Sequence, residues 1–238
     1  PSLPQPLHFT RRLRNTASSS RRLANRQSIN PTMPKKYTRQ GVEAAVRLSQ
    51  CKDDSIWLSI ESKYSDMIAE KGGDELVELE QFCEELAETM KSEQQITKDG
   101  LLKIVQWKFL VGKPRYALMN HLKANTAAQV KEHTKSGFAF ADEGDAKQAI
   151  SEVAKLRGVG PATASAILSI YKPDMFVFMA DEVIECLYEG KRGYTASIYH
   201  KVNDKCSELA ENLGSEWNPR RVGRALWSAS RISAGGGD

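Results

Sequence analysis

The sequence predicts an all-α protein, and three observations favour that fold class. Apolar residues recur at helical spacing over most of the chain after residue 37; in Asp74–Met90 they follow an i, i+3, i+4 pattern, with glutamates on the opposite face. Helix-start signals, such as Thr97 and Asp145, precede several of these stretches. Only residues 175–179, MFVFM, have the character of an extended segment.

The first expected helices lie in the N-terminal half of the chain. Gly41–Leu48 places its apolar residues on one side, and Gly72-Gly73 forms a turn before the helix over Asp74–Met90. Thr97–Phe109 begins with an N-cap threonine, whose hydroxyl accepts a hydrogen bond from a backbone N–H of the first turn. Residues 111–122 restart a helix after a glycine and a proline.

The helices of the C-terminal half have clearer boundaries. Asp145 begins one whose apolar residues face inward up to Leu156, and Pro161 opens the next, which extends to Tyr171. Proline is favoured at a first helical position, because the N–H that it lacks would have no partner there. Asn218-Pro219 begins the last helix, before a GGGD tail that should fray.

Length and composition limit the class of protein. With 238 residues, 40% of them hydrophobic and 27% charged, the chain is typical of a globular protein with a sizeable core. No run approaches the ~18 apolar residues of a membrane span, so no membrane partner is expected. The four cysteines lie far apart without a C-x-x-C pair, which argues against a zinc or iron–sulfur site and against a disulfide framework. We expect a monomer in a reducing compartment, without metal or other cofactor.

The charge changes sign twice along the chain. Residues 1–40 contain nine Lys or Arg residues and no acidic residue, whereas residues 41–94 contain five basic and fourteen acidic residues. Residues 95–238 contain twenty basic and sixteen acidic residues. A nucleic-acid interface is therefore expected in the tail or in the C-terminal part. The acidic face of Asp74–Met90 is expected to be solvated surface, with a patch for a basic protein partner as the alternative.

The most informative motif is a break in the helical pattern at Leu156–Ser169, LRGVGPATASAILS. Its GVGPAT core satisfies part of the G-x-G-x-x-G dinucleotide fingerprint. That fingerprint follows a strand, whereas Asp145–Arg157 is helical by period and the third glycine is missing. A helix-hairpin-helix fits better: one helix ends, Gly158 and Gly160 make a tight turn, and the next helix opens with proline.

Such a turn is suited to binding DNA. Its free N–H groups point outward together and form an anion site for a phosphate, without reading any base. For the glycines alone, the alternative is an αα-corner in which they serve only the bend. The residues expected to bind DNA are Arg157, Gly158, Val159, Gly160, Ala162 and Thr163.

The whole string, with an aspartate about twenty residues further on, resembles the helix-hairpin-helix superfamily of DNA glycosylases. Hairpins of that superfamily have the form L-P-G-V-G-x-x-T-A, followed by a loop that usually contains proline and by a catalytic aspartate that starts the next helix. The resemblance covers about residues 145–190. The matching positions are Leu156, Gly158, Val159, Gly160, Thr163, Ala164, Pro173 in the loop and Asp181 in MADEVIECL.

The resemblance implies a role for Asp181. A base would be flipped from the duplex into a pocket beside the hairpin, and the Asp181 carboxylate would stabilise the oxocarbenium-like sugar or activate the attacking water. Ala162 stands where bifunctional members carry a nucleophilic lysine, so no lyase activity is expected. Asp181 is also a good helix N-cap, which is the alternative role for this residue, although the two roles coexist in the family. Glu182 beside it would disfavour DNA unless it points away.

Several other groups have weaker signals. Aromatic residues at helical spacing are typical of a protein core, although they could also stack on a flipped base; these are Trp107, Tyr116, Tyr171, Phe176 and Phe178. Clustered basic residues are typical of solvated surface, although they could also contact phosphates; these are Arg220, Arg221 and Arg224 on the last helix, and Lys108, Lys113 and Arg115. The four histidines show neither metal-ligand nor triad spacing.

The helical pattern predicts an all-α chain in three parts, and the resemblance implies a DNA-glycosylase-like fold for it. Residues 1–36 form a disordered basic tail or targeting segment, residues 37–94 an acidic N-terminal helical region, and residues 95–233 a helix-hairpin-helix glycosylase-like domain. The expected function is that of a monofunctional DNA N-glycosylase of base excision repair, acting on double-stranded DNA. The alternative is a non-catalytic helix-hairpin-helix module that binds DNA or a protein, within a chromatin complex.

The expected location is the nucleus. It changes to the mitochondrion or plastid if residues 1–32, which are rich in Arg and Ser and free of acidic residues, form a transit peptide. Met33 also has the surroundings of a start of translation, so an over-extended or alternative start is the other interpretation of the basic tail.

Overall fold

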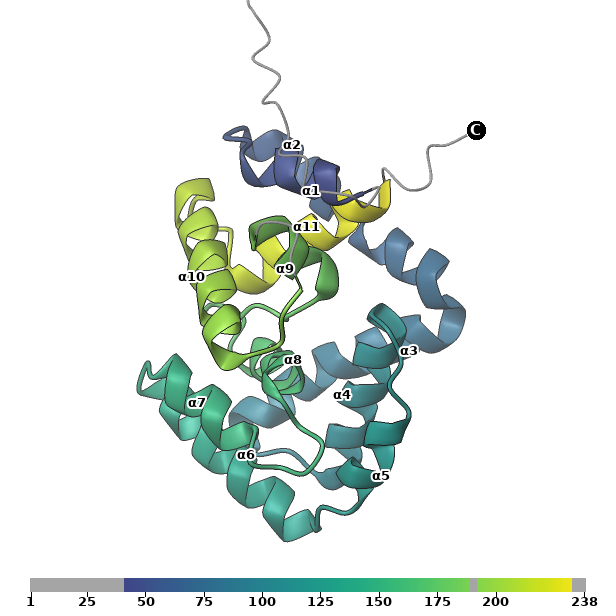
Figure 1. Cartoon of the computed structure of the whole chain (residues 1–238), viewed down its shortest axis with the longest axis vertical. Helices are drawn as coiled ribbons and strands as arrows, with labels where there is room; N and C mark the ends of the chain where they lie inside the picture. Colours follow the sequence, from purple (N-terminus) through teal and green to yellow (C-terminus); the bar gives the residue numbers. More distant parts are fainter. Residues whose placement is uncertain (1–40, 189–191, 233–238) are drawn as a thin grey trace, which may run out of the picture. The chain divides into compact units, whose positions relative to one another are not determined.

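The computed structural model describes residues 41–188 and 192–232, and within these ranges every regular element is a helix (Figure 1). The all-α prediction is confirmed. The basic tail 1–36, residues 37–40 and the GGGD end lie outside the described residues. The helices are α1 (Val42–Ser49), α2 (Asp54–Glu61), α3 (Tyr64–Glu93), α4 (Lys98–Val111), α5 (Ala117–Lys123), α6 (Ala127–Asp142), α7 (Ala146–Val153), α8 (Pro161–Tyr171), α9 (Asp181–Leu187), α10 (Ala196–Leu213) and α11 (Pro219–Ile232).

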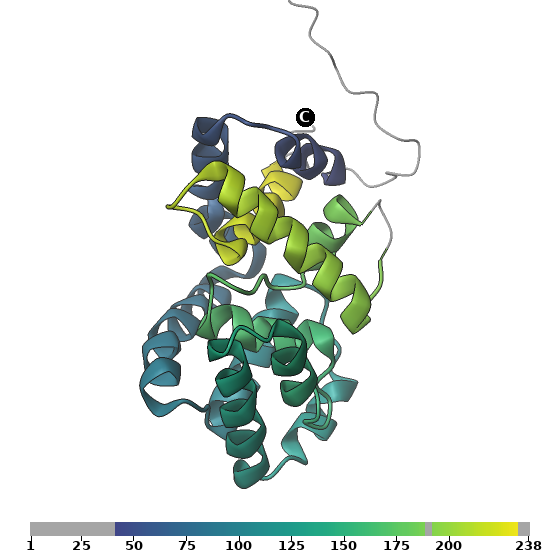
Figure 2. The same cartoon turned by 90° about the vertical axis from the view of Figure 1, so that its left-hand side faces the viewer.

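Helix α8 is the central helix of the core. It is buried from Thr163 to Tyr171 and contacts α3, α4, α6, α7 and α10 (Figures 1 and 2). Its many alanines and serines allow this close packing, because they present small surfaces to the neighbouring helices. At its C-terminal end, Phe138 of α6 stacks on Tyr171 with 3.8 Å between the ring centroids. Only the first turn, Pro161 and Ala162, is partly open to solvent.

Three helix starts lie where the sequence predicts them. The Thr97 hydroxyl accepts from the N–H of Gly100 at 3.0 Å, and the Asp145 carboxylate accepts from two N–H groups of the first turn of α7. Pro161 is the first residue of α8. A non-helical φ of 59° and ψ of −156° at Gly73, within α3, confirm the predicted turn there.

Helices α2, α6 and α10 lie where no helix is predicted. All three begin with capping signals that the sequence contains. At the start of α2, the Asp53 carboxylate accepts from the Ser55 N–H at 3.0 Å. The side chains of Thr126 and Gln129 each bond the other's backbone N–H, at 3.1 and 2.9 Å, which is a capping box at the start of α6. The Thr195 hydroxyl accepts from the Ile198 N–H at 3.3 Å at the start of α10.

Residues 172–180 connect α8 to α9 without a strand partner, and they include the predicted extended segment MFVFM. Side chains supply the missing hydrogen bonds. The buried amide of Asn203 accepts from the Val177 N–H at 2.9 Å and donates to the Met175 carbonyl at 3.0 Å. The hydroxyl of Ser165, on α8, accepts a further backbone N–H of this segment at 3.0 Å. These bonds fix the chain that leads to Asp181.

Buried ion pairs connect the acidic helices to the last helix. Glu80 of α3 accepts from Arg224 of α11 at 2.5 Å, from the Trp107 indole N–H at 2.5 Å and from the Tyr64 hydroxyl at 3.0 Å, and its side chain is only 14% exposed. The hydrophobic core is likewise continuous from α1 to α11. Residues of both predicted regions, 41–94 and 95–232, therefore contribute to one core.

Two neighbouring pairs extend this network. Glu84 pairs with Arg220 at 3.1 Å and also with Arg224, and Arg221 pairs with Glu61 of α2 at 3.2 Å. One prediction is wrong here: the arginines of α11 are buried or partly buried and not solvated surface. The acidic residues of Asp74–Met90 are exposed, as predicted, apart from Glu80. A helical pattern shows that a face is polar but not what covers it.

Each described helix falls short of the length or the apolar composition that a membrane crossing needs.

The four cysteines are free thiols, and three of them, Cys83, Cys186 and Cys206, are buried.

Candidate active site

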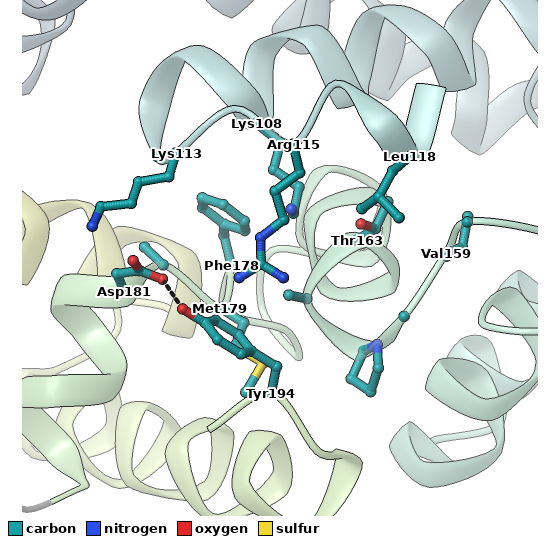
Figure 3. Close-up of a pocket in the computed structure, with 16 residues that line it drawn as sticks. Lys108, Lys113, Arg115, Leu118, Val159, Thr163, Phe178, Met179, Asp181 and Tyr194 are labelled. Carbon is teal, nitrogen blue, oxygen red and sulfur yellow. Dashed lines mark hydrogen bonds between the residues drawn. The ribbon is translucent and has the colours of Figure 1, made fainter. Parts of the chain in front are cut away.

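One cavity contains both the turn before α8 and the aspartate at the start of α9. It has a volume of about 360 Å³ and lies between the end of α4, the loop that follows it, the turn, and the segment before α9 (Figure 3). Of the predicted site residues, Arg157 is exposed and lies outside the lining of the cavity. The predicted residues that line it are Gly158, Val159, Gly160, Ala162, Thr163 and Asp181.

The turn between α7 and α8 is fixed by Asn125, which no sequence motif singles out. This residue is 2% exposed; its Oδ1 accepts from the Arg157 N–H and its Nδ2 donates to the Arg157 carbonyl, both at 2.9 Å. Nδ2 also donates to the Leu122 carbonyl at 2.9 Å. Leaving a buried backbone group without a partner costs about 1–3 kcal/mol, so these bonds favour one position of the turn.

The two glycines of the turn have different roles. Gly158 has a φ of +78°, and a Cβ there would lie 3.1 Å from atoms of both His121 and Leu122. Gly160 has a φ of −105° and a ψ of −177°, which any residue adopts, and a Cβ there would meet nothing within 4 Å. Both glycines lie in the turn as predicted, but only Gly158 needs the conformational freedom of glycine. The missing side chain of Gly160 leaves backbone bare at the cavity.

Backbone N–H groups of the turn are free to bind a ligand. Those of Gly158, Gly160 and Ala162 have no acceptor among the described residues, whereas those of Val159 and Thr163 bond carbonyls of the turn. The donors of Gly160 and Ala162 lie at the N-terminus of α8, where the helix dipole adds positive potential. Free donors in such a position can bind an anion.

Asp181 is the first residue of α9, and its carboxylate faces the cavity (Figure 3). The N-cap residue is Ala180, without a side-chain hydrogen bond, so the alternative that Asp181 serves as the helix cap is wrong. Oδ1 accepts from the Tyr194 hydroxyl at 2.7 Å, and Oδ2 pairs with Arg192 at 2.8 Å. The Asp181 side chain is 17% exposed.

Glu182 points away from Asp181. Its Oε1 pairs with Arg231 of α11 at 3.1 Å, and Glu182 is not among the residues that line the cavity. Burial raises the pKa of the Glu182 carboxyl, although Arg231 opposes the shift. The negative charge of Glu182 is therefore directed to α11, and not to a ligand in the cavity.

Three cationic side chains line the cavity beside Asp181. Lys113 and Arg115 extend from the loop after α4, and Lys108 comes from the last turn of that helix (Figure 3). The Arg115 guanidinium lies over the Tyr194 ring, 4.9 Å from its centroid. Burial, reinforced by Arg115, lowers the pKa of Lys108 to about 8. Burial and the hydrogen bond to Asp181 raise the pKa of Tyr194 to about 12. Lys108, predicted as solvated surface, is instead half-buried in the cavity wall.

Most of the predicted aromatic candidates belong to the core. Trp107, Tyr171 and Phe176 are buried, whereas Phe178 lines the cavity with its ring centroid 5.0 Å from that of Trp107. Tyr116, directly after Arg115, is 71% exposed. Prediction from the sequence missed Asn125, Arg192 and Tyr194, because none of them belongs to a motif or a periodic pattern.

No group of three or more His, Cys, Asp or Glu side chains in residues 41–188 and 192–232 is placed to bind a metal. Comparison of the chain with protein-family models, with curated proteins and with solved structures gives no match. What the cavity can do chemically therefore follows from its own residues.

Proposed function

We propose that this protein is a monofunctional DNA N-glycosylase of the helix-hairpin-helix type, which binds duplex DNA through the turn before α8 and releases a flipped base with Asp181. One observation carries the proposal: the Asp181 carboxylate and the free N–H groups of Gly158, Gly160 and Ala162 share one cavity. A phosphate on the turn and a sugar beside the carboxylate would then belong to the same stretch of DNA.

The cavity suits a nucleotide in size and charge. Its volume of about 360 Å³ is within the ~300–1,000 Å³ of small-ligand sites, and it opens to solvent beside the turn. Lys113 and Arg115 add positive charge on the opposite wall, where a second phosphate would lie. Phe178 offers an apolar surface for a base.

Asp181 supplies the chemistry in this proposal. As the bond between the base and C1′ breaks, positive charge develops on the sugar, and a fixed carboxylate stabilises that charge. The hydrogen bond from Tyr194 and the ion pair with Arg192 orient the carboxylate before substrate arrives. Tyr194 and Arg192 are therefore positioning residues, which act through Asp181.

Replacing Asp181 by asparagine should lower base release by at least about 100-fold, because the charge that stabilises the sugar is lost while the shape is kept. The measurement is base release from duplex oligonucleotides that carry a panel of base lesions, together with the affinity for the same duplexes. Affinity should remain, and Asp174→Asn, at an exposed residue of the loop before α9, should release base like the wild type. Absence of release on every lesion would leave the non-catalytic DNA-binding module as the function.

Replacing Lys113 or Arg157 by glutamine should weaken DNA binding. The plot of log affinity against log salt concentration should also become less steep, by about 1 for each phosphate that the variant no longer neutralises. Lys113 lines the cavity, and Arg157 is exposed at the edge of the turn. Lys131→Gln is the matched control, since Lys131 is exposed on α6, which contributes no lining residue. Equal slopes for all three variants would show that DNA binds elsewhere.

A further inference from the structure

Arg231, in the last turn of α11, joins the two elements that lead into opposite walls of the cavity. Its Nη2 donates to Glu182 Oε1 at 3.1 Å and, at a longer 3.5 Å, to the Val111 carbonyl. Glu182 directly follows Asp181 in α9. Val111 is the last residue of α4, where the loop that carries Lys113 begins. One nitrogen atom therefore bonds a residue beside each wall.

The chemistry of both acceptors suits a guanidinium. The last carbonyls of a helix have no helical donor, and no backbone N–H of the described residues donates to the Val111 carbonyl. The dipole of α4 adds negative potential at this end, which favours a cation. On the other side, Oε2 of Glu182 is buried without a hydrogen bond, so the bond of Oε1 to Arg231 connects this carboxylate to α11.

An aromatic ring restrains the guanidinium between these acceptors. The central carbon of the Arg231 guanidinium lies 4.1 Å from the centroid of the Trp227 ring, which is buried one turn earlier on α11. Helix α11 also packs on α9, whereas α4 and α9 are not closely packed on each other. A side chain of α11 is therefore the means by which the start of α9 and the end of α4 are held together.

The proposed reaction needs the two walls at a fixed separation. Lys113 and Arg115 reach into the cavity from one side and Asp181 from the other (Figure 3). In the proposed complex, the cations contact a phosphate while the carboxylate acts on a sugar of the same strand. Misplacing a catalytic group by ~1 Å can lower a rate about 100-fold.

We propose that Arg231 is a positioning residue, which sets the distance between Asp181 and the phosphate-binding loop after α4. This inference rests on the proposed function for the ligand of each wall. Arg231 does not line the cavity, so it touches neither sugar nor base and acts through Glu182 and Val111. Its loss should slow base release and leave the DNA contacts in place.

The first test is single-turnover base release by the full chain, measured together with duplex affinity. Arg231→Met keeps an unbranched side chain against the Trp227 ring and removes the hydrogen bonds. The rate constant of release should fall by at least about tenfold, and the affinity should stay within a few-fold of the wild type. Loss of folded protein alone would lower the amplitude of release and leave the rate constant unchanged.

Two further variants distinguish positioning from a general effect on α11. Arg231→Lys keeps the charge without the planar fork, so it should recover the rate constant only in part. Arg221→Met is the matched control, because Arg221 lies on the same helix, pairs with Glu61 and does not line the cavity. Its rate constant should equal that of the wild type. A wild-type rate constant in Arg231→Met overturns the role of Arg231 and leaves the glycosylase proposal standing.

Hydrogen exchange tests the role of Arg231 independently of any base release. The amides of residues 109–112 and 184–187 bond within α4 and α9, so their exchange reports how firmly these helix ends are held. Both sets should exchange at least about tenfold faster in Arg231→Met, and neither should change in Arg221→Met. Faster exchange without base release from any lesion supports the bridge and overturns the glycosylase proposal. Unchanged exchange in Arg231→Met overturns the bridge, whether or not base is released.

Discussion

Replacing Glu80 by alanine should lower the free energy of unfolding by about 3–5 kcal/mol, because it removes one partner from a buried ion pair and leaves charge uncompensated. The Glu80 carboxylate accepts from Arg224, Trp107 and Tyr64, and it lies 4.0 Å from Arg220. The indole and hydroxyl donors lose their only described acceptor in the variant. Urea unfolding followed by circular dichroism measures the loss.

Glu84→Ala is the matched control for Glu80→Ala. Glu84 pairs with the same two arginines, but its side chain is 49% exposed and its removal leaves Glu80 in place. Exposed pairs contribute about 0–1 kcal/mol, so the control should lose no more than that. Equal losses in the two variants would show that the buried donors to Glu80 contribute nothing beyond a surface ion pair.

This network also bears on the candidate site. Arg224 and Arg231 both belong to α11, and Arg231 pairs with Glu182, which directly follows Asp181. The acidic helices therefore stabilise, through α11, the helix that carries the candidate catalytic residue. A truncation that removes α1–α3 would leave the buried Arg220 without its carboxylate partners, so activity should be assayed on the full chain.

The parts of the fold that were predicted from the sequence depend on local interactions. The Thr97 cap, the Asp145 cap and the proline at the start of α8 each act within one helical turn, so neighbouring residues encode them. The positive φ of Gly158 is likewise a local property of the turn. The sequence therefore indicated where the turn lies and which residues compose it.

The contacts that build the site join residues far apart in the chain. Asn125 and Arg157 are 32 residues apart, Tyr194 and Asp181 are 13 apart, and Glu80 and Arg224 are 144 apart. No periodic pattern relates such pairs, and their chemistry becomes visible only when the helices pack. The same holds for Lys108: its sequence neighbours are those of a surface lysine, and its half-buried place in the cavity wall comes from packing.

Replacing Gly158 by alanine should destabilise the protein by on the order of 1–3 kcal/mol, since a positive φ strains any residue with a Cβ. Contacts of 3.1 Å to His121 and Leu122 leave the added carbon little room. The equivalent change at Gly160 should alter the free energy of unfolding by less than about 1 kcal/mol, because its φ and ψ suit alanine and the space beside it is open.

DNA binding should show the reverse order. In the proposed complex, a methyl group on Gly160 would occupy open space beside the N–H groups of Gly160 and Ala162, which the phosphate approaches. A hydrogen bond to a charged group contributes about 1.5–3 kcal/mol, so Gly160→Ala should lower DNA affinity by roughly tenfold or more while the protein stays folded. Gly158→Ala, assayed well below its unfolding transition, should lower DNA affinity less than Gly160→Ala does, because its added carbon faces His121 and Leu122 and acts on the phosphate site only through a shift of the turn. Wild-type affinity in Gly160→Ala would mean that DNA does not contact the turn, and the open backbone at Gly160 would need another ligand.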